Sequence, residues 1–192
     1  MNLVAVATNA VIAFACTNLD DFALLVGWFS DQSHRPAHIA LGQIIGLAIL
    51  IAVSTLAALV ALVLPKPIVG LLGIIPVLVG IARLLGNRKR FALQKTPAAG
   101  TLAVAGVTVA NGGDNIAIYT PLLAAQTSIG IALVIIVLLL MSLIWIAAAN
   151  WFVSHPAWGP TVRRWGLRVA PWLLIALGLN ILYQAGSIDL LD

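Results

Sequence analysis

Three aspartates, Asp20, Asp21 and Asp114, lie within long apolar stretches of the chain. These stretches, residues 3–29 and 98–125, contain no lysine or arginine that could neutralise them. An ionised residue near the centre of a membrane helix costs about 2.5 to 3.5 kcal/mol on insertion scales, and such residues mark ion pathways. Oxygen atoms are the preferred ligands of hard divalent cations. The three carboxylates therefore predict a cation-binding site at membrane depth.

Amide and hydroxyl side chains accompany the aspartates on the same predicted helix faces. They are Thr17 and Asn18 in the first stretch and Thr108, Asn111 and Asn115 in the second. On an α-helix Asn18 and Asp21 lie about 60° apart, and the second set recurs at spacings of three and four residues. If the two faces meet, they supply two or three carboxylates and several neutral oxygens, which suit a divalent cation.

Two neighbouring features add to this predicted site. Cys16 stands one turn before Asp20, where it is either a soft sulfur ligand or simply a small apolar residue. Gly112 and Gly113 weaken the helix within the second set, and an unwound turn there would offer backbone carbonyl oxygens. The repeat described below favours Asp21 as the primary ligand, whereas Asp20 lies closer to Cys16, so the choice between them stays open.

The composition is that of a membrane protein. Of the 192 residues, 62% are hydrophobic and only 8% are charged, and the mean hydropathy is +1.10, which is incompatible with a water-soluble domain of this size. The formal net charge of +4 comes from basic residues in short connections between apolar runs, where they orient helices. We therefore expect a lipid bilayer, and no nucleic acid, around this chain.

Six apolar runs approach the roughly 20 residues that a helix needs to span a bilayer. They lie near residues 3–29, 38–64, 68–85, 98–125, 129–153 and 167–185. Pro65-Lys66-Pro67 forms a tight turn after the second run. Gly42 and Gly46, within that run, fit the small-xxx-small pattern of closely packed helices. The sequence thus predicts a single all-α polytopic membrane domain over residues 1–192, with about six transmembrane helices.

An internal repeat divides these runs into three plus three. Asn18-x-x-Asp21 in the first run is echoed by Asn111-x-x-Asp114 in the fourth. The predicted halves are residues 1–90 and 98–192. Because each half has an odd number of helices, the second is predicted to be inverted relative to the first, as in secondary transporters whose site lies at the repeat interface.

Charged and aromatic residues predict the orientation. Basic residues follow the first, third and fifth runs, whereas Lys66 alone lies on the opposite side. Because the basic side is cytoplasmic, both termini are expected on the outer side of the cell (inner or plasma) membrane. The N-terminus lacks a positive n-region, so the first run is expected to persist as a helix rather than as a cleaved signal. Of six tryptophans, Trp145 lies deepest, while the others form an interfacial belt.

Four segments carry a resemblance to a known family. They are Asn18-Leu19-Asp20-Asp21, Gly42-Gln43-Ile44-Ile45-Gly46, Leu71-Leu72-Gly73-Ile74-Ile75-Pro76 with Gly80-Ile81, and the stretch from Asn111 to Pro121. With them the chain resembles the cadmium resistance (CadD-type) transporters of the LysE superfamily. The resemblance implies a small ATP-independent exporter of cadmium or a related divalent ion. It also implies that Asp20, Asp21, Asp114 and Asn115 lie on the ion path.

An ion gradient is expected to drive transport, because no Walker A sequence occurs in the chain. Exporting a divalent cation against an inside-negative potential costs about 4.6 kcal/mol per 100 mV. Importing two protons in exchange cancels this electrical cost, because no net charge then crosses the membrane. Carboxylates suit this coupling, since protonation removes the charges that hold the metal. We therefore expect a secondary-active exporter of a divalent heavy-metal cation, cadmium first, which exchanges it for protons and needs no cofactor.

Other functions stay open at this stage. The cation could be manganese or zinc, because oxygen ligands suit several divalent ions. A small organic solute such as an amino acid is a further candidate, although no cationic group stands ready for a substrate carboxylate. Gly112-Gly113-Asp114 approaches the GxGD motif of intramembrane aspartyl proteases, but Asn111 replaces the first glycine and no Tyr-Asp partner occurs. We therefore expect no enzyme, and homo-oligomerisation is left open.

Overall fold

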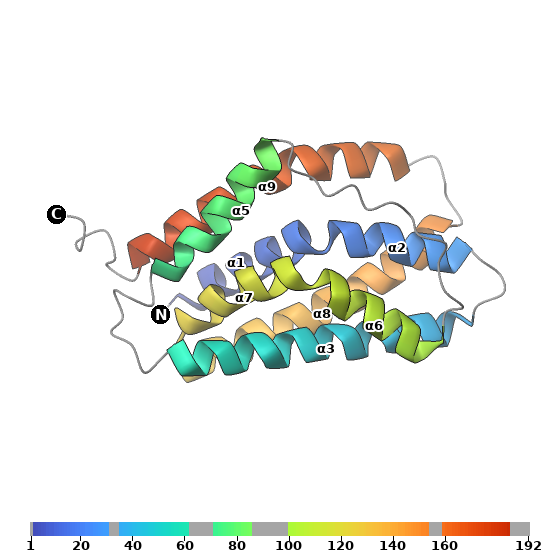
Figure 1. The fold of residues 1–192 in the computed structure, drawn as a ribbon, viewed down its shortest axis with the longest axis horizontal. Coiled ribbons are helices and arrows are strands. Elements are labelled where there is room, and N and C mark those ends of the chain that lie inside the picture. Colours follow the sequence, from blue (N-terminus) through green and yellow to red (C-terminus); the bar gives the residue numbers. More distant parts are fainter. Residues whose placement is uncertain (1, 31–34, 62–70, 86–99, 154–158, 185–192) are drawn as a thin grey trace.

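The computed structural model describes residues 2–30, 35–61, 71–85, 100–153 and 159–184, with side chains for all of these except residues 83 and 159–170. Every regular element in these ranges is a helix, and the helices run roughly along the long axis of the molecule (Figure 1). In chain order they are α1 (Leu3–Thr17), α2 (Leu19–Ser30), α3 (Pro36–Ala61), the short 3-10 helix η1 (Leu71–Gly73), α5 (Ile74–Leu84), α6 (Thr101–Asn111), α7 (Gly113–Ala124), α8 (Ser128–Val153) and α9 (Gly159–Gln184). The predicted all-α class is confirmed.

Two helices, α3 and α8, are each long and apolar enough to cross a bilayer, with 26 residues apiece. Helices α1 and α2 pass the same test together but bend by 59° at their junction, as in a broken span or a re-entrant loop. Shorter apolar segments lie at Leu71–Ala82, Thr101–Asn111 and Pro171–Tyr183. The described ranges therefore contain two or three candidate spans by length and composition, as expected of a polytopic membrane protein. The total of six stays a prediction.

The prediction of one continuous helix over residues 3–29 is wrong, because Asn18 separates α1 from α2. Asn18 Nδ2 donates to the Phe14 carbonyl oxygen at 2.9 Å, the same oxygen that accepts the Asn18 backbone N–H at 3.0 Å. The Asn18 carbonyl oxygen accepts a hydrogen bond from Trp145 Nε1 at 2.9 Å. Part of what stabilises this break therefore comes from a different helix, α8.

The fourth run is also broken, at the position that the glycine pair predicts. Helix α6 ends at Asn111 and α7 begins at Gly113, so Gly112 lies between them. A Cβ atom added to Gly112 would overlap the side chain of Leu50 in α3. The predicted weak point is confirmed, and glycine also leaves room there for the neighbouring helix.

The last helix begins earlier than the sequence predicts. Helix α9 starts at Gly159 rather than near residue 167, because Pro160 falls in its first turn, where its missing N–H has no helical partner to lose. With 26 residues, α9 is as long as α3 and α8. The predicted turn at Pro65-Lys66-Pro67 lies outside the described residues.

Glycines let α3 pack closely against α6, as the small-xxx-small pattern predicts. A Cβ atom added to Gly42 would lie 2.6 Å from the Thr101 carbonyl oxygen. One added to Gly46 would lie 2.6 Å from the Thr108 Cβ atom. The backbone of α3 therefore touches α6 directly at both positions.

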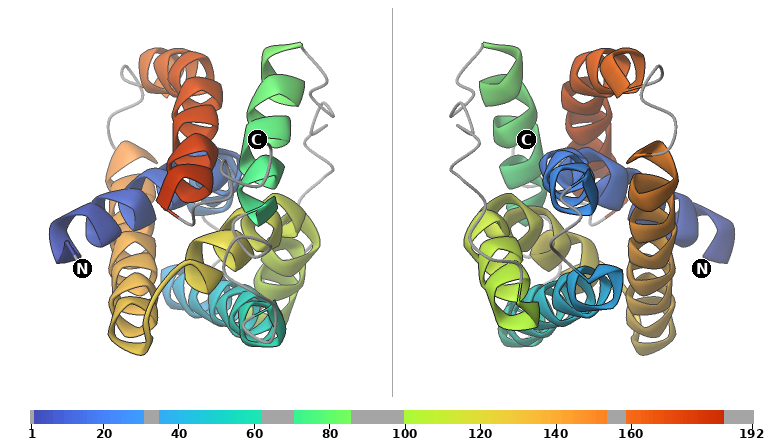
Figure 2. Two further views of the ribbon diagram at one scale, coloured as in Figure 1. Left: turned by 90° about the vertical axis from the view of Figure 1, so that its left-hand side faces the viewer. Right: turned by 90° about the vertical axis from the view of Figure 1, so that its right-hand side faces the viewer.

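Helices α5 and α9 form a second close pair, side by side at one edge of the bundle (Figure 2). A Cβ atom added to Gly73, just before α5, would lie 2.7 Å from the Gly178 carbonyl oxygen. One added to Gly80 would lie 2.7 Å from the Pro171 carbonyl oxygen. Because earlier residues of one segment meet later residues of the other, the two helices run antiparallel.

Gly42→Ala is expected to lower the unfolding temperature of the purified protein, because its methyl group would push α6 away from α3. Overpacking of this kind costs about 1 to 3 kcal/mol. Gly106→Ala is the matched control: Gly106 lies in α6 with nothing within 4 Å of an added Cβ, and helix propensity should stabilise that variant by about 0.5 to 1 kcal/mol. Thermal unfolding in detergent measures both, and equal shifts would contradict the described packing.

Candidate metal site

The two helix breaks face each other inside the bundle. Asn18, at the first break, is completely buried. Its Nδ2 atom lies 2.8 Å from Tyr119 Oη and 3.4 Å from Asn115 Oδ1, both in α7 just after the second break. Thr17 Oγ1 lies 3.2 Å from the same Tyr119 hydroxyl. Hydrogen bonds thus join the end of α1 to the beginning of α7.

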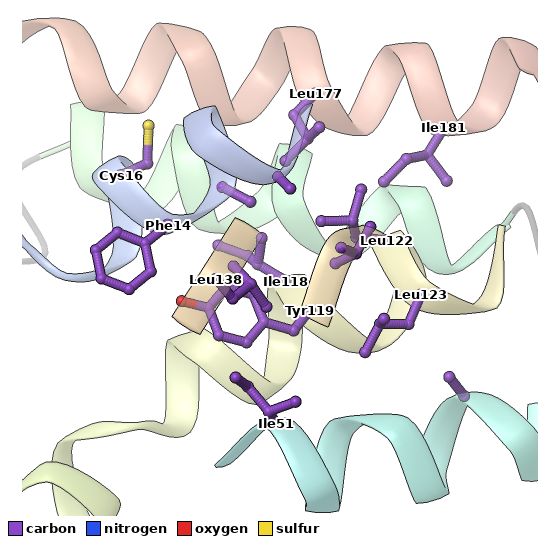
Figure 3. Packing of buried hydrophobic residues seen from close by; sticks show 14 of the residues in the cluster. Phe14, Cys16, Ile51, Ile118, Tyr119, Leu122, Leu123, Leu138, Leu177 and Ile181 are labelled. Atoms are coloured by element: carbon purple, nitrogen blue, oxygen red, sulfur yellow. The ribbon is translucent and has the colours of Figure 1, made fainter. Parts of the chain in front are cut away.

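Apolar side chains surround this polar contact. Tyr119 is fully buried and belongs to a cluster with Phe14, Ile118 and Leu122 (Figure 3). Such packing removes bulk water, and hydrogen bonds in a low-dielectric interior are electrostatically stronger than in water. The hydrogen bonds between the two breaks are therefore buried within apolar packing. Sequence reasoning did not single out Tyr119, although it stands one turn after Asn115 on the same helix.

Trp145 holds the first break from a third side. Besides its hydrogen bond to the Asn18 carbonyl oxygen, its ring packs edge-on against Phe14 and Phe22, with centroids 5.5 Å apart in each case. Phe14 lies in α1 and Phe22 in α2, so one tryptophan contacts both sides of the break. Its depth in the fifth apolar run was the available signal that it differs from the interfacial tryptophans.

Asp21 is the buried carboxylate of the first motif. It is only 4% exposed, whereas its neighbour Asp20 is exposed. Gln43 Nε2 donates to Asp21 Oδ2 at 3.3 Å. Asp114, from the second break, lies within electrostatic range of the Asp21 carboxylate. The two carboxylates thus belong to the two helix breaks that Asn18 joins, one in each half of the chain.

Helix N-termini contribute to holding these carboxylates inside the bundle. Asp20 and Asp21 lie in the first turn of α2, and Asp114 lies in the first turn of α7. A negative side chain near a helix N-terminus is stabilised by about 0.3 to 1 kcal/mol. Asp114 Oδ1 also accepts the Asn115 backbone N–H at 3.1 Å. The two breaks therefore create the helix ends that favour negative charge inside the bundle.

Amide groups complete the surroundings of the carboxylates. Asn115 is buried and Asn111 is half-buried. Asn18 Oδ1 and Asn111 Nδ2 are buried atoms that make no hydrogen bond within the described part of the chain. Of these two atoms, the Asn18 carbonyl oxygen is the one that can bind a cation directly.

The hydroxyl of Thr108 points to a residue that the predicted ligand set does not include. Thr108 Oγ1 donates to Gln43 Oε1 at 2.8 Å, and Gln43 in turn contacts Asp21. Gln43 is 2% exposed. A polar residue between Gly42 and Gly46, in a closely packed membrane helix, was the sequence signal for it.

Cys16 is buried in the apolar cluster around Phe14, and in the view of Figure 3 its sulfur points away from the Tyr119 hydroxyl. Across the ranges that the structure describes, no group of three or more histidine, cysteine, aspartate or glutamate side chains could hold a metal ion. A cation at Asp21 and Asp114 would therefore take its remaining ligands from amide, hydroxyl and backbone oxygens. Such an oxygen-rich shell suits hard and borderline divalent ions.

Comparison with known proteins adds one finding. Residues 14–192 match the family described as cadmium resistance transporter. No curated protein and no solved structure matches the chain. The matched region contains both helix breaks and every candidate ligand.

Proposed function

Because the chain belongs to the cadmium resistance transporter family, we propose that it exports divalent cadmium across the cell membrane in exchange for protons. Membership makes the chain a membrane transporter of a metal cation, and not an enzyme. Cadmium is then the substrate that the site holds, and protons are the ions that replace it.

The observation that carries this proposal is that hydrogen bonds from Asn18 join the two helix breaks, with Asp21 buried at the first break and within electrostatic range of Asp114 at the second. Two carboxylates balance the double charge of the cation, and each comes from a different half of the chain. Asp21 is the buried carboxylate, whereas Asp20 is exposed. A carboxylate exposed at membrane depth is stable only beside water or a partner group, so we assign Asp20 to the access path and Asp21 to the ion.

Proton exchange follows from the chemistry of the same pair. Protonation of Asp21 and Asp114 removes the two charges that attract the cation, so the metal leaves when protons arrive. Exchange of two protons for one divalent cation moves no net charge, which removes the cost of about 4.6 kcal/mol per 100 mV for outward transport. Asp21 and Asp114 therefore serve both ions in turn.

The order of helices supports the predicted inverted repeat. Each half has a broken helix (α1–α2, α6–α7), then a helix of 26 residues (α3, α8), then a glycine-packed helix (α5, α9). The antiparallel contact of α5 with α9 is what two-fold inversion requires of equivalent helices. With six spans and cytoplasmic basic loops, both termini lie outside in this proposal.

A metal panel tests the proposed function. Cells that express the protein should survive higher cadmium concentrations, and vesicles containing it should show cadmium flux that acidification of the opposite side accelerates. Zinc, manganese and cobalt are assayed in parallel, with protein-free vesicles as the control. Flux of manganese alone would reassign the cation, and protection against none of the metals would favour an organic solute.

A further inference from the structure

Gln43 occupies a position where a long polar side chain has to be fully hydrogen-bonded. It lies in α3 between Gly42 and Gly46, where the backbone of α3 touches α6, and it is 2% exposed. A buried amide without partners is destabilising, because its hydrogen bonds to water are lost. The two partners that it finds are Asp21 and Thr108.

These two contacts define the orientation of the Gln43 amide. Nε2 donates to Asp21 Oδ2 at 3.3 Å, and Oε1 accepts from Thr108 Oγ1 at 2.8 Å. An ionised carboxylate only accepts, so the N–H side of the amide faces Asp21 while Asp21 is charged. In this orientation Gln43 presents hydrogen atoms to the place where a cation bound to Asp21 would sit.

Thr108 can also hydrogen-bond to the Gln43 amide in the reversed orientation. Its hydroxyl has a second acceptor in reach, the Val104 carbonyl oxygen at 3.1 Å, and it carries one proton for two acceptors. If the Gln43 amide reverses, Nε2 can donate to Thr108 Oγ1 while the Thr108 proton turns to Val104. Gln43 Oε1 then faces Asp21, while Nε2 is hydrogen-bonded to Thr108, so the oxygen is left to bind a cation.

We propose that Gln43 is an additional ligand of the transported cation, and that its side-chain amide reverses when the cation binds at Asp21. This inference rests on the proposed function. Thr108, which the sequence places among the metal ligands, becomes a positioning residue that holds the Gln43 amide in either orientation. The cation thus gains a neutral oxygen from α3, a helix that carries no aspartate.

Cadmium binding to purified variants tests this role, with Gln43→Glu and Gln43→Leu as the matched pair. Glutamate keeps an oxygen at the same reach but has no N–H, whereas leucine removes both. If Oε1 binds the ion, Gln43→Glu should bind cadmium at least as tightly as wild type, and Gln43→Leu should bind it about tenfold or more weakly, equivalent to losing about 1.4 kcal/mol. If Gln43 only holds Asp21 in place through its N–H, Gln43→Glu should bind cadmium more weakly than Gln43→Leu, because the new carboxylate repels Asp21. Weaker binding by Gln43→Glu than by Gln43→Leu would therefore overturn the proposal.

Infrared difference spectra of the wild-type protein with isotope-labelled glutamine give an independent answer if a variant does not fold. Cadmium binding should lower the stretching frequency of one glutamine side-chain carbonyl, whereas unchanged glutamine bands would refute coordination by Gln43. Asp114→Asn separates this inference from the proposed function. If the wild-type protein binds no cadmium, the proposed function fails. If the wild-type protein binds cadmium and Asp114→Asn does not, the proposed metal site holds, and the Gln43 variants alone decide whether Gln43 is a ligand.

Discussion

Asp114→Asn is expected to abolish the exchange of cadmium for protons in reconstituted vesicles. Asparagine keeps the size of the side chain and an oxygen that can still accept the Asn115 N–H, so the first turn of α7 should fold as before. The variant loses one of the two charges that hold the cation and a group that takes up a proton. Asp114 is half-buried, and losing one of two carboxylates that neutralise a divalent cation should weaken its binding about a hundredfold or more, equivalent to about 2.7 kcal/mol.

The measurement is the initial rate of cadmium flux and of coupled proton movement in vesicles of matched protein content. Thermal unfolding of the purified variant serves as the folding control. Normal exchange by a well-folded Asp114→Asn protein would refute the assignment of this carboxylate to the ion path.

Asp21→Asn and Asp20→Asn, changes in adjacent residues, are expected to differ sharply. Asp21 is buried and interacts with Gln43 and Asp114, so its replacement should weaken cadmium binding at least about a hundredfold. Asp20 is exposed, so its charge lies outside the buried site that Asp21 shares with Gln43. We therefore expect Asp20→Asn to change affinity by at most about fivefold.

Isothermal titration of the two purified variants with cadmium gives both affinities under the same conditions. Because the substitutions are chemically identical and one residue apart, differences in expression or general helix stability should largely cancel. A larger loss in Asp20→Asn than in Asp21→Asn would make Asp20 the primary ligand.

Much of the candidate site could be predicted from local sequence. The weak helix at Gly112 and the close packing at Gly42 and Gly46 follow from properties of glycine that act within one or two turns. Asp21 and Asp114 stood out because carboxylates in apolar stretches require compensation. Gln43 and Trp145 escaped the ligand list, since both residue types also have ordinary structural uses in membrane helices.

The sequence by itself determined the membrane class, the all-α fold and the residues that carry charge into the bundle, because composition and hydrophobic run length depend on the chain alone. Only the tertiary structure decided that α1 breaks at Asn18, whose partners Tyr119 and Trp145 lie 101 and 127 residues away. It also decided that Asp21 rather than Asp20 is buried, since Asp21 lies on the side of α2 that contacts Gln43 of α3. Contacts between distant segments determine these choices, and no local pattern encodes them.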